Sequence, residues 1–112
     1  MDIKGYSERT FEEIKHFTDE QIEFWYAREL ASVLGYKRWD KFKNVIEKAK
    51  DACDNSGFSI EDHFSQVGNM VELGSGAQRE IEDIMLSRYA CYLIVQNADP
   101  KKESVALGQT YF

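Results

Sequence analysis

The sequence predicts an α+β fold: a helix-rich single domain over residues 1–112, with a helix-turn-helix-like pair and one or two short β-hairpins. Apolar residues at three- and four-residue spacing mark the helices, and short apolar runs around polar turns mark the strands. One proline and seven glycines leave little room for long irregular segments. With 43% hydrophobic residues, a chain of 112 residues can build one core without disulfides or metals.

The first predicted elements are a short helix and a hairpin. Residues Ser7 to Lys15 fit the helix, and Thr10 and Glu13 have the spacing of a capping box. The following stretch, KHFTDEQIEFWYA, has two short apolar or aromatic runs around the polar turn TDEQ. This pattern predicts a hairpin.

The next two helices form the predicted helix-turn-helix-like pair. ARELASVLGY is a short helix, and Gly35 is its natural stop because glycine adopts the left-handed conformation at little cost. The second helix begins near Arg38 or Trp39 and ends near Cys53. Its apolar positions form one buried stripe: Trp39, Phe42, Ile46, Ala49 and Cys53. Two helices joined by three or four residues that include glycine match the motif.

The second half predicts a hairpin and a buried helix. QVGNMVEL and REIEDIML flank the turn GSGAQ, although Ile81, Ile84 and Met85 would also suit a helix. Ser87 is the predicted N-cap of a helix over 88–96 that is apolar on nearly every side and therefore buried.

Asn97 and Pro100 end that helix, and ESVALGQTYF begins another helical segment without a closing signal. We therefore expect the chain to be part of a longer one.

Positive charge is concentrated in one segment of an acidic chain. The net charge is −6, yet residues 34–50 hold six of the fourteen Lys and Arg residues. Residues 27–53 have a net charge of +3, whereas residues 1–26 have −4 and residues 54–86 have −6. The negative net charge of the chain argues against nonspecific binding to DNA or anionic lipid. The uneven distribution of charge along the chain, however, favours one basic face that would contact DNA in one orientation.

We expect that basic face on the second helix of the pair. Lys37, Lys41, Asn44 and Lys48 have positions i, i+4, i+7 and i+11, away from the apolar stripe. Arg38 lies beside them, as does Lys43. The predicted nucleic-acid-binding residues are Lys37, Arg38, Lys41, Asn44 and Lys48, with Asn44 a candidate for reading adenine. The alternative interpretation is an ordinary solvated lysine-rich face.

Several other residues have two interpretations. Trp39 could stack on a base, but its place in the apolar stripe favours the core, as for Trp25 and the pair Tyr89 and Tyr92. Arg79 could contact a phosphate, but an ion pair with a neighbouring glutamate is favoured.

Other classes of function find little support. The sequence has no phosphate-binding loop, dinucleotide fingerprint or zinc-hydrolase motif, so we expect no enzyme and no cofactor. Cys53 and Cys91 are expected to be reduced thiols, and with His16 and His63 they lack the spacing of a metal site. No apolar run approaches eighteen residues and the start lacks a secretory pattern, so we expect no membrane contact and a cytoplasmic location.

Three long segments carry a family resemblance: FWYARELASVLGYKRWDKFKNVIEKAKDAC, SGFSIEDHF and LSRYACYLIVQNADP with GQTYF. They resemble the DNA-damage-inducible protein D family, and the first half is similar to the Bro-N domain of phage antirepressors and viral proteins. The resemblance implies a bacterial or phage protein of the DNA-damage (SOS) response, without known catalytic residues. Family members are longer, so this chain would be their N-terminal domain.

The resemblance also draws attention to two arginines. Arg28 and Arg88 match the family framework, and each is predicted near a helix N-terminus, where the helix dipole disfavours a cation. A buried partner or a bound anion would explain them, and Arg79 is a third candidate for such a contact.

Two functional hypotheses follow. The first is a DNA-associating domain that uses the basic helix. The second is a protein-interaction module that modulates a repair partner such as a recombinase filament, through the acidic segment with Glu80, Glu82 and Asp83. A homodimer would suit the first hypothesis, because one copy offers few phosphate contacts.

Overall fold

The structure, a computed structural model, describes residues 10–112. Residues 10–13 are helical. The elements that follow are β1 (His16–Phe17), β2 (Glu23–Tyr26), α2 (Ala27–Val33), α3 (Trp39–Asn55), α4 (Ile60–His63), β3 (Phe64–Glu72), β4 (Gln78–Leu86), α5 (Arg88–Asn97) and α6 (Glu103–Tyr111). The predicted α+β class is confirmed.

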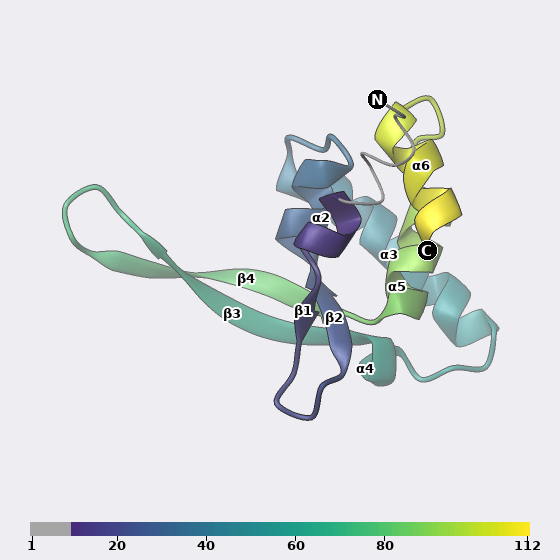
Figure 1. The fold of residues 1–112 in the computed structure, drawn as a ribbon, viewed down its shortest axis with the longest axis horizontal. Helices are drawn as coiled ribbons and strands as arrows, with labels where there is room; N and C mark the ends of the chain where they lie inside the picture. Colours follow the sequence, from purple (N-terminus) through teal and green to yellow (C-terminus); the bar gives the residue numbers. More distant parts are fainter. Residues whose placement is uncertain (1–9) are drawn as a thin grey trace.

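The strands form one antiparallel sheet in the order β1-β2-β4-β3. Strand β2 meets β4 only where Trp25 pairs with Leu86 and Tyr26 with Met85, whereas β3 and β4 pair along their whole length. The β3–β4 hairpin therefore extends past the other strands. Its outer part, residues 70–80 on either side of the turn, projects from the helices as an arm (Figure 1).

Both predicted hairpins are present, and the second is longer than its sequence pattern indicates. The alternative of a helix over Ile81, Ile84 and Met85 is wrong, because these residues belong to β4. Ile84 and Leu86, two residues apart, are buried in the core, as strand periodicity requires.

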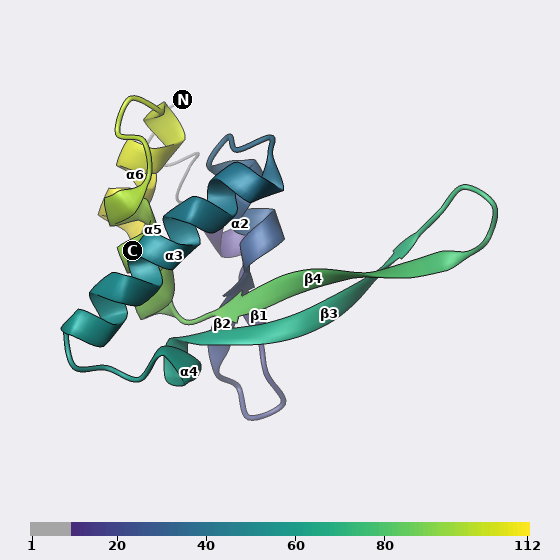
Figure 2. The ribbon, with the colours of Figure 1, turned by 180° about the vertical axis from the view of Figure 1, so that it is seen from behind.

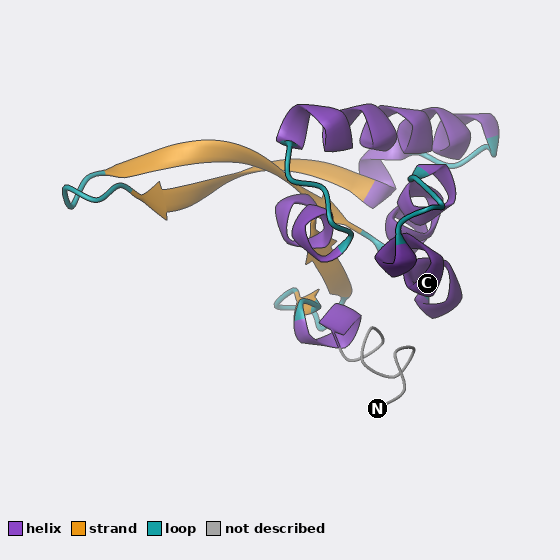
Figure 3. Cartoon of the chain, turned by 90° about the horizontal axis from the view of Figure 1, so that it is seen from above, coloured by secondary structure: helices purple, strands orange, loops and turns teal. Residues whose placement is uncertain are grey.

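The core lies between the base of the sheet and the helices, with α5 at its centre. Long helix α3 crosses α5 and packs against it (Figures 2 and 3). The predicted stripe of α3 faces this contact: Phe42, Ile46, Ala49 and Cys53 are buried, and Trp39 is half-buried. The predicted burial of α5 and of Trp25 is confirmed.

The start of α5 agrees with its predicted N-cap, whereas the start of the first helix does not. Ser87 caps α5, accepting a hydrogen bond from the Ala90 amide at 3.0 Å, as predicted. The predicted start of the first helix at Ser7 lies outside the described residues. Thr10 is itself helical, so its prediction as the N-cap is wrong.

Gly35 ends α2 as predicted. It has a φ of +81°, a conformation that strains any other residue. The Tyr36 amide donates to the Ala31 carbonyl at 2.9 Å, and the Gly35 amide donates to the Ser32 carbonyl at 3.1 Å. This pair of bonds is the Schellman motif, and it turns the chain sharply toward α3.

Candidate nucleic-acid interface

The turn between α2 and α3 is held by a distant part of the chain. The Tyr36 hydroxyl accepts a hydrogen bond from the Asp99 amide at 3.0 Å. The Lys102 ammonium donates to the Gly35 carbonyl at 3.3 Å and lies 5.2 Å from the centre of the Tyr36 ring. The segment before α6 thus brings a further cation to the turn.

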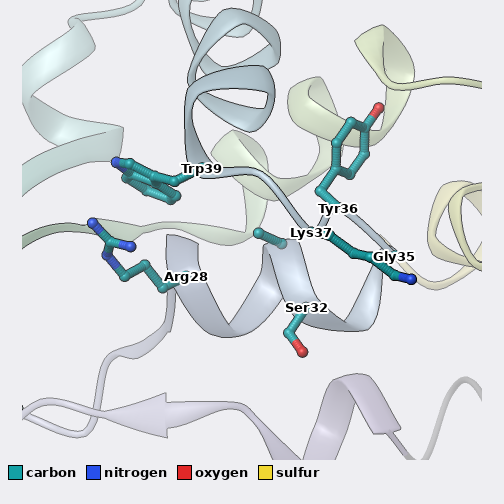
Figure 4. A pocket seen from close by; sticks show the side chains of 7 residues that line it. Arg28, Ser32, Gly35, Tyr36, Lys37 and Trp39 are labelled. Atoms are coloured by element: carbon teal, nitrogen blue, oxygen red, sulfur yellow. The ribbon is translucent and has the colours of Figure 1, made fainter.

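Two adjoining clefts open at this turn. One of about 520 Å³ has Arg28 and Trp39 among its lining residues, together with Ser32, Gly35 and Lys37 (Figure 4). The other, of about 390 Å³, is lined by the turn and by four cations. We call these cations the basic turn cluster: Lys37, Arg38, Lys41 and Lys102.

Trp39 joins the start of α3 to strand β4. Its indole nitrogen donates to the Glu82 carboxylate at 2.8 Å, and the Lys43 ammonium binds the same oxygen at 3.0 Å. The hydrogen bond from Trp39 is the largest cause that lowers the pKa of Glu82, and the bond from Lys43 is the next. The indole is therefore a fixed anchor for α3 rather than a mobile stacking platform.

Arg28 completes that anchor. Its guanidinium lies 4.2 Å from the centre of the Trp39 ring, and its Nε donates to the Glu82 carbonyl at 2.7 Å. These contacts give Arg28 partners within the domain. The cleft they border is thus held by residues from α2, α3 and β4.

Asp83 fixes the other end of α2. This carboxylate, only 2% exposed, accepts hydrogen bonds from the Arg28 amide at 3.0 Å and from the Asn69 side chain at 2.7 Å. The N-cap residue of α2, Tyr26, makes no side-chain capping bond. A carboxylate from β4 therefore does the capping that the local sequence does not.

The predicted basic face is only partly on α3. The helix begins at Trp39 and the backbone of Arg38 is extended, so the placement of Lys37 on the helix is wrong. Lys37 lies in the turn instead. The other three predicted residues are exposed on α3. Lys41 lies in the first turn, Asn44 about one turn beyond it and Lys48 about two turns beyond it.

The cations of the predicted face differ in their partners. Arg38 forms a two-pronged ion pair with Asp40, with bonds of 2.8 and 3.2 Å, and this hydrogen bonding lowers the pKa of Asp40. Lys37, Lys41 and Lys48 make no ion pair with any residue that the structure describes.

The far end of α3 is less basic than its start. Glu47 and Asp51 are exposed around Lys48, and Glu47 pairs with Lys50 at 3.6 Å. The uncompensated positive charge is therefore centred on the turn and the first turn of α3.

The comparisons with known proteins agree with the resemblance of the sequence. Residues 13–111 match the BRO family, N-terminal domain (Bro-N). The chain belongs to the Bro-N family. It is also 53% identical over 102 residues to DNA damage-inducible protein D of Escherichia coli (strain K12). The match covers 91% of this chain and 37% of that relative, so the chain spans well under half the relative's length. No solved structure matches it.

Arg88 has a partner within this Bro-N domain. Its guanidinium binds the Glu23 carboxylate at 2.7 and 3.2 Å and lies 5.1 Å from the ring centre of Trp25. The hydrogen bonds from Arg88 lower the pKa of Glu23. Of the two explanations for this arginine, the structure supports a protein partner.

The predicted ion pair of Arg79 and the predicted core position of Tyr92 are wrong. Arg79 is exposed on the arm and forms no ion pair with a described residue, so the favoured pairing with a glutamate is absent there. Tyr92 is 40% exposed, so only its neighbour Tyr89 packs against the core.

The acidic residues of the second hypothesis do not form one free surface. Glu82 is bound by Trp39 and Lys43, and Asp83 is buried. Of the three, Glu80 alone is both exposed and without a side-chain hydrogen bond or ion pair to a described residue. Long-range pairing of this kind gives no signal in local sequence.

Other chemistry-bearing residues have structural roles. The His63 ring nitrogen lies 2.7 Å from the Ser87 hydroxyl, which the sequence did not predict, and this hydroxyl also caps α5. Among residues 10–112, no cluster of three or more His, Cys, Asp or Glu side chains could hold a metal ion. None of the helices described in this range is long and apolar enough to cross a membrane.

The sequence did not indicate Lys102 as a site residue. It lies 65 positions from Lys37, and no motif relates the two. Its approach to the turn depends on the packing of α6 and the Asp99–Tyr36 hydrogen bond.

Proposed function

We propose that this Bro-N domain is a non-enzymatic module that associates with DNA through the basic turn cluster. One observation carries the proposal: four cations line one cleft at the turn, and Lys37, Lys41 and Lys102 have no ion-pair partner among residues 10–112. Phosphate oxygens are the ligands that such uncompensated lysines bind in nucleic acids.

The position of the cluster supports an anionic ligand. A helix N-terminus carries partial positive charge, and cations beside it are unfavourable. Lys37 and Arg38 immediately precede α3. The N-cap residue, Arg38, makes no side-chain capping bond and pairs instead with Asp40 in the first turn, which leaves Lys37 uncompensated there. A phosphate bound at this end would meet both the cations and the helix dipole, and so offset their repulsion.

The charge of the rest of the domain orients the contact. The chain has a net charge of −6, so DNA is repelled from most other approaches. About four phosphate contacts give a slope of roughly −3 to −4 in a plot of log affinity against log salt. Binding by a single copy is therefore weak and strongly salt-dependent.

The test is a salt series of duplex DNA binding, followed by fluorescence anisotropy. The double variant Lys37→Gln/Lys41→Gln removes two of the proposed contacts, so its slope becomes shallower by about 2. Arg79→Gln is the matched control, because it removes an exposed positive charge from the arm instead. Equal slopes in the double variant and the wild type, or an equal loss in the control, would contradict the proposal.

A damage-response role is the second part of the proposal. It rests on the 53% identity to the E. coli relative, which is a DNA damage-inducible protein. In this role the domain works in the bacterial cytoplasm beside DNA-repair proteins, and the exposed arm offers a surface for one of them. A pull-down with the arm variant Glu80→Lys tests the repair-partner alternative, since loss of partner with unchanged DNA binding would favour it.

A further inference from the structure

Strand β3 forms an open edge of the sheet. It is the last strand in the order β1-β2-β4-β3, and it pairs with β4 alone. Figures 1 and 2 show the hairpin leaving the helices, so the outer part of β3 has no element beside it. An open edge exposes backbone groups that can pair with another strand.

The hydrogen bonds at the two ends of the hairpin show which residues face that edge. The Leu73 amide donates to the Ala77 carbonyl at 2.8 Å, and the Ser87 amide donates to the His63 carbonyl at 3.1 Å. In an antiparallel pair, hydrogen-bonding direction alternates along the strand. The odd-numbered residues of β3 therefore bond to β4.

The even-numbered residues of β3 consequently point their amides and carbonyls outward: Gln66, Gly68, Met70 and Glu72. None of these groups has a backbone or side-chain hydrogen bond to a described residue beyond the hairpin. They form a continuous row of free donors and acceptors.

This edge lacks the usual protection against pairing. Proteins block open edges with charged residues, proline or β-bulges. Residues 64–71, FSQVGNMV, contain no charge and no proline, and the pairing with β4 continues without a bulge.

The opposite edge of the hairpin is different. On β4, Leu86 pairs with β2, and the Glu82 carbonyl accepts the bond from Arg28. The exposed part of β4 also carries Arg79 and Glu80. The two edges of one hairpin thus differ in both charge and occupancy.

We propose that the edge of β3 pairs antiparallel with β3 of a second copy of this chain, which gives a two-fold dimer with a continuous sheet across both arms. Each copy has a net charge of −6, so two copies repel each other over most of their surface. An uncharged edge is a place where two identical copies can meet without that repulsion. Full overlap of residues 64–72 would place Glu72, the edge's only charge, opposite Phe64 of the partner, so the two Glu72 carboxylates do not face each other.

The shape of the domain favours this arrangement. Antiparallel arms place the two acidic bodies at opposite ends of the joined sheet, since each arm projects from its own body (Figure 1). In this register Met70, which is 58% exposed, is covered by the partner strand and lies opposite Gln66 of the partner. The dimer would also present two basic turn clusters to one DNA molecule.

Sedimentation equilibrium of the full chain over a concentration series tests the dimer. The wild-type mass should rise from 13.0 kDa toward twice that value. Met70→Pro removes an outward amide and leaves the β4 ladder intact, so this variant should remain a monomer. Gln78→Pro is the matched control: it removes an amide from the opposite edge of the same hairpin and should dimerise like the wild type.

A second variant covers the chance that proline damages the hairpin. Met70→Lys keeps the amide but places a charge on the edge, and should weaken the dimer by about tenfold or more. A wild type that stays monomeric throughout overturns the proposal. So does dimerisation of all variants alike, or equal loss in the Met70 and Gln78 prolines.

Discussion

Asp83 is the residue whose removal should destabilise the domain most for its size. Asp83→Ala deletes a carboxylate that is 2% exposed and binds two distant parts of the chain. The Arg28 amide loses its acceptor at 3.0 Å, and the Asn69 side chain loses one at 2.7 Å. Both donors then remain in a partly buried place with no replacement.

The magnitude follows from the kinds of bond that are lost. A hydrogen bond to a charged group contributes about 1.5–3 kcal/mol, and loss of a helix cap costs about 1 kcal/mol. Because the bond to Arg28 is itself the cap, we expect a loss of about 3 kcal/mol in the free energy of unfolding. For a domain of this size, about 4 °C per kcal/mol corresponds to a fall of roughly 12 °C in Tm.

Urea unfolding followed by circular dichroism measures this change. Glu80→Ala is the control, because it removes an exposed carboxylate three residues earlier on β4 and should change stability by less than about 0.5 kcal/mol. If Asp83→Ala is as mild as Glu80→Ala, then the carboxylate does not hold α2 on the sheet, and the reasoning is refuted.

Two other perturbations give distinct outcomes. Gly35→Ala should lower the free energy of unfolding by about 1–2 kcal/mol in a urea titration, because the φ of +81° disfavours a Cβ. Gly74→Ala is the control and should lower it much less. Equal losses in the two variants would contradict the strained conformation assigned to Gly35. The pKa of Glu23 is lowered from its ordinary value of 4.5 by Arg88, so the stability from this pair is complete above that value and is lost as the pH falls through the lower folded value. The unfolding free energy should therefore fall as the pH drops below about 4.5. Glu23→Gln should make this fall shallower, and an unchanged slope in the variant would exclude the pair as its source.

The helices and turns could be predicted because their signals are local. The stripe from Trp39 to Cys53 gives α3, Ser87 gives the start of α5, and Gly35 gives the end of α2. Each of these features depends on residues within a single helix or at its end. The alternation in β4 was harder to recognise, because Ile81, Ile84 and Met85 also fit a helix.

The connections between elements could not be predicted in the same way. Asp83 caps a helix 55 residues earlier, and Lys102 reaches a carbonyl 67 residues earlier. No local pattern encodes such pairs. The acidic and basic segments of the sequence therefore indicated the polarity of the domain. They did not show that Glu82 and Asp83 bind α2 and α3, or that Lys102 joins the basic cleft.

An NMR titration of the labelled chain with a short DNA duplex tests the central claim most directly. The account predicts amide shifts confined to the turn and its neighbours, over residues 35–41 and around Lys102, which disappear as salt is raised. Shifts that centre on the arm or on the far end of α3, or that persist at high salt, would contradict it.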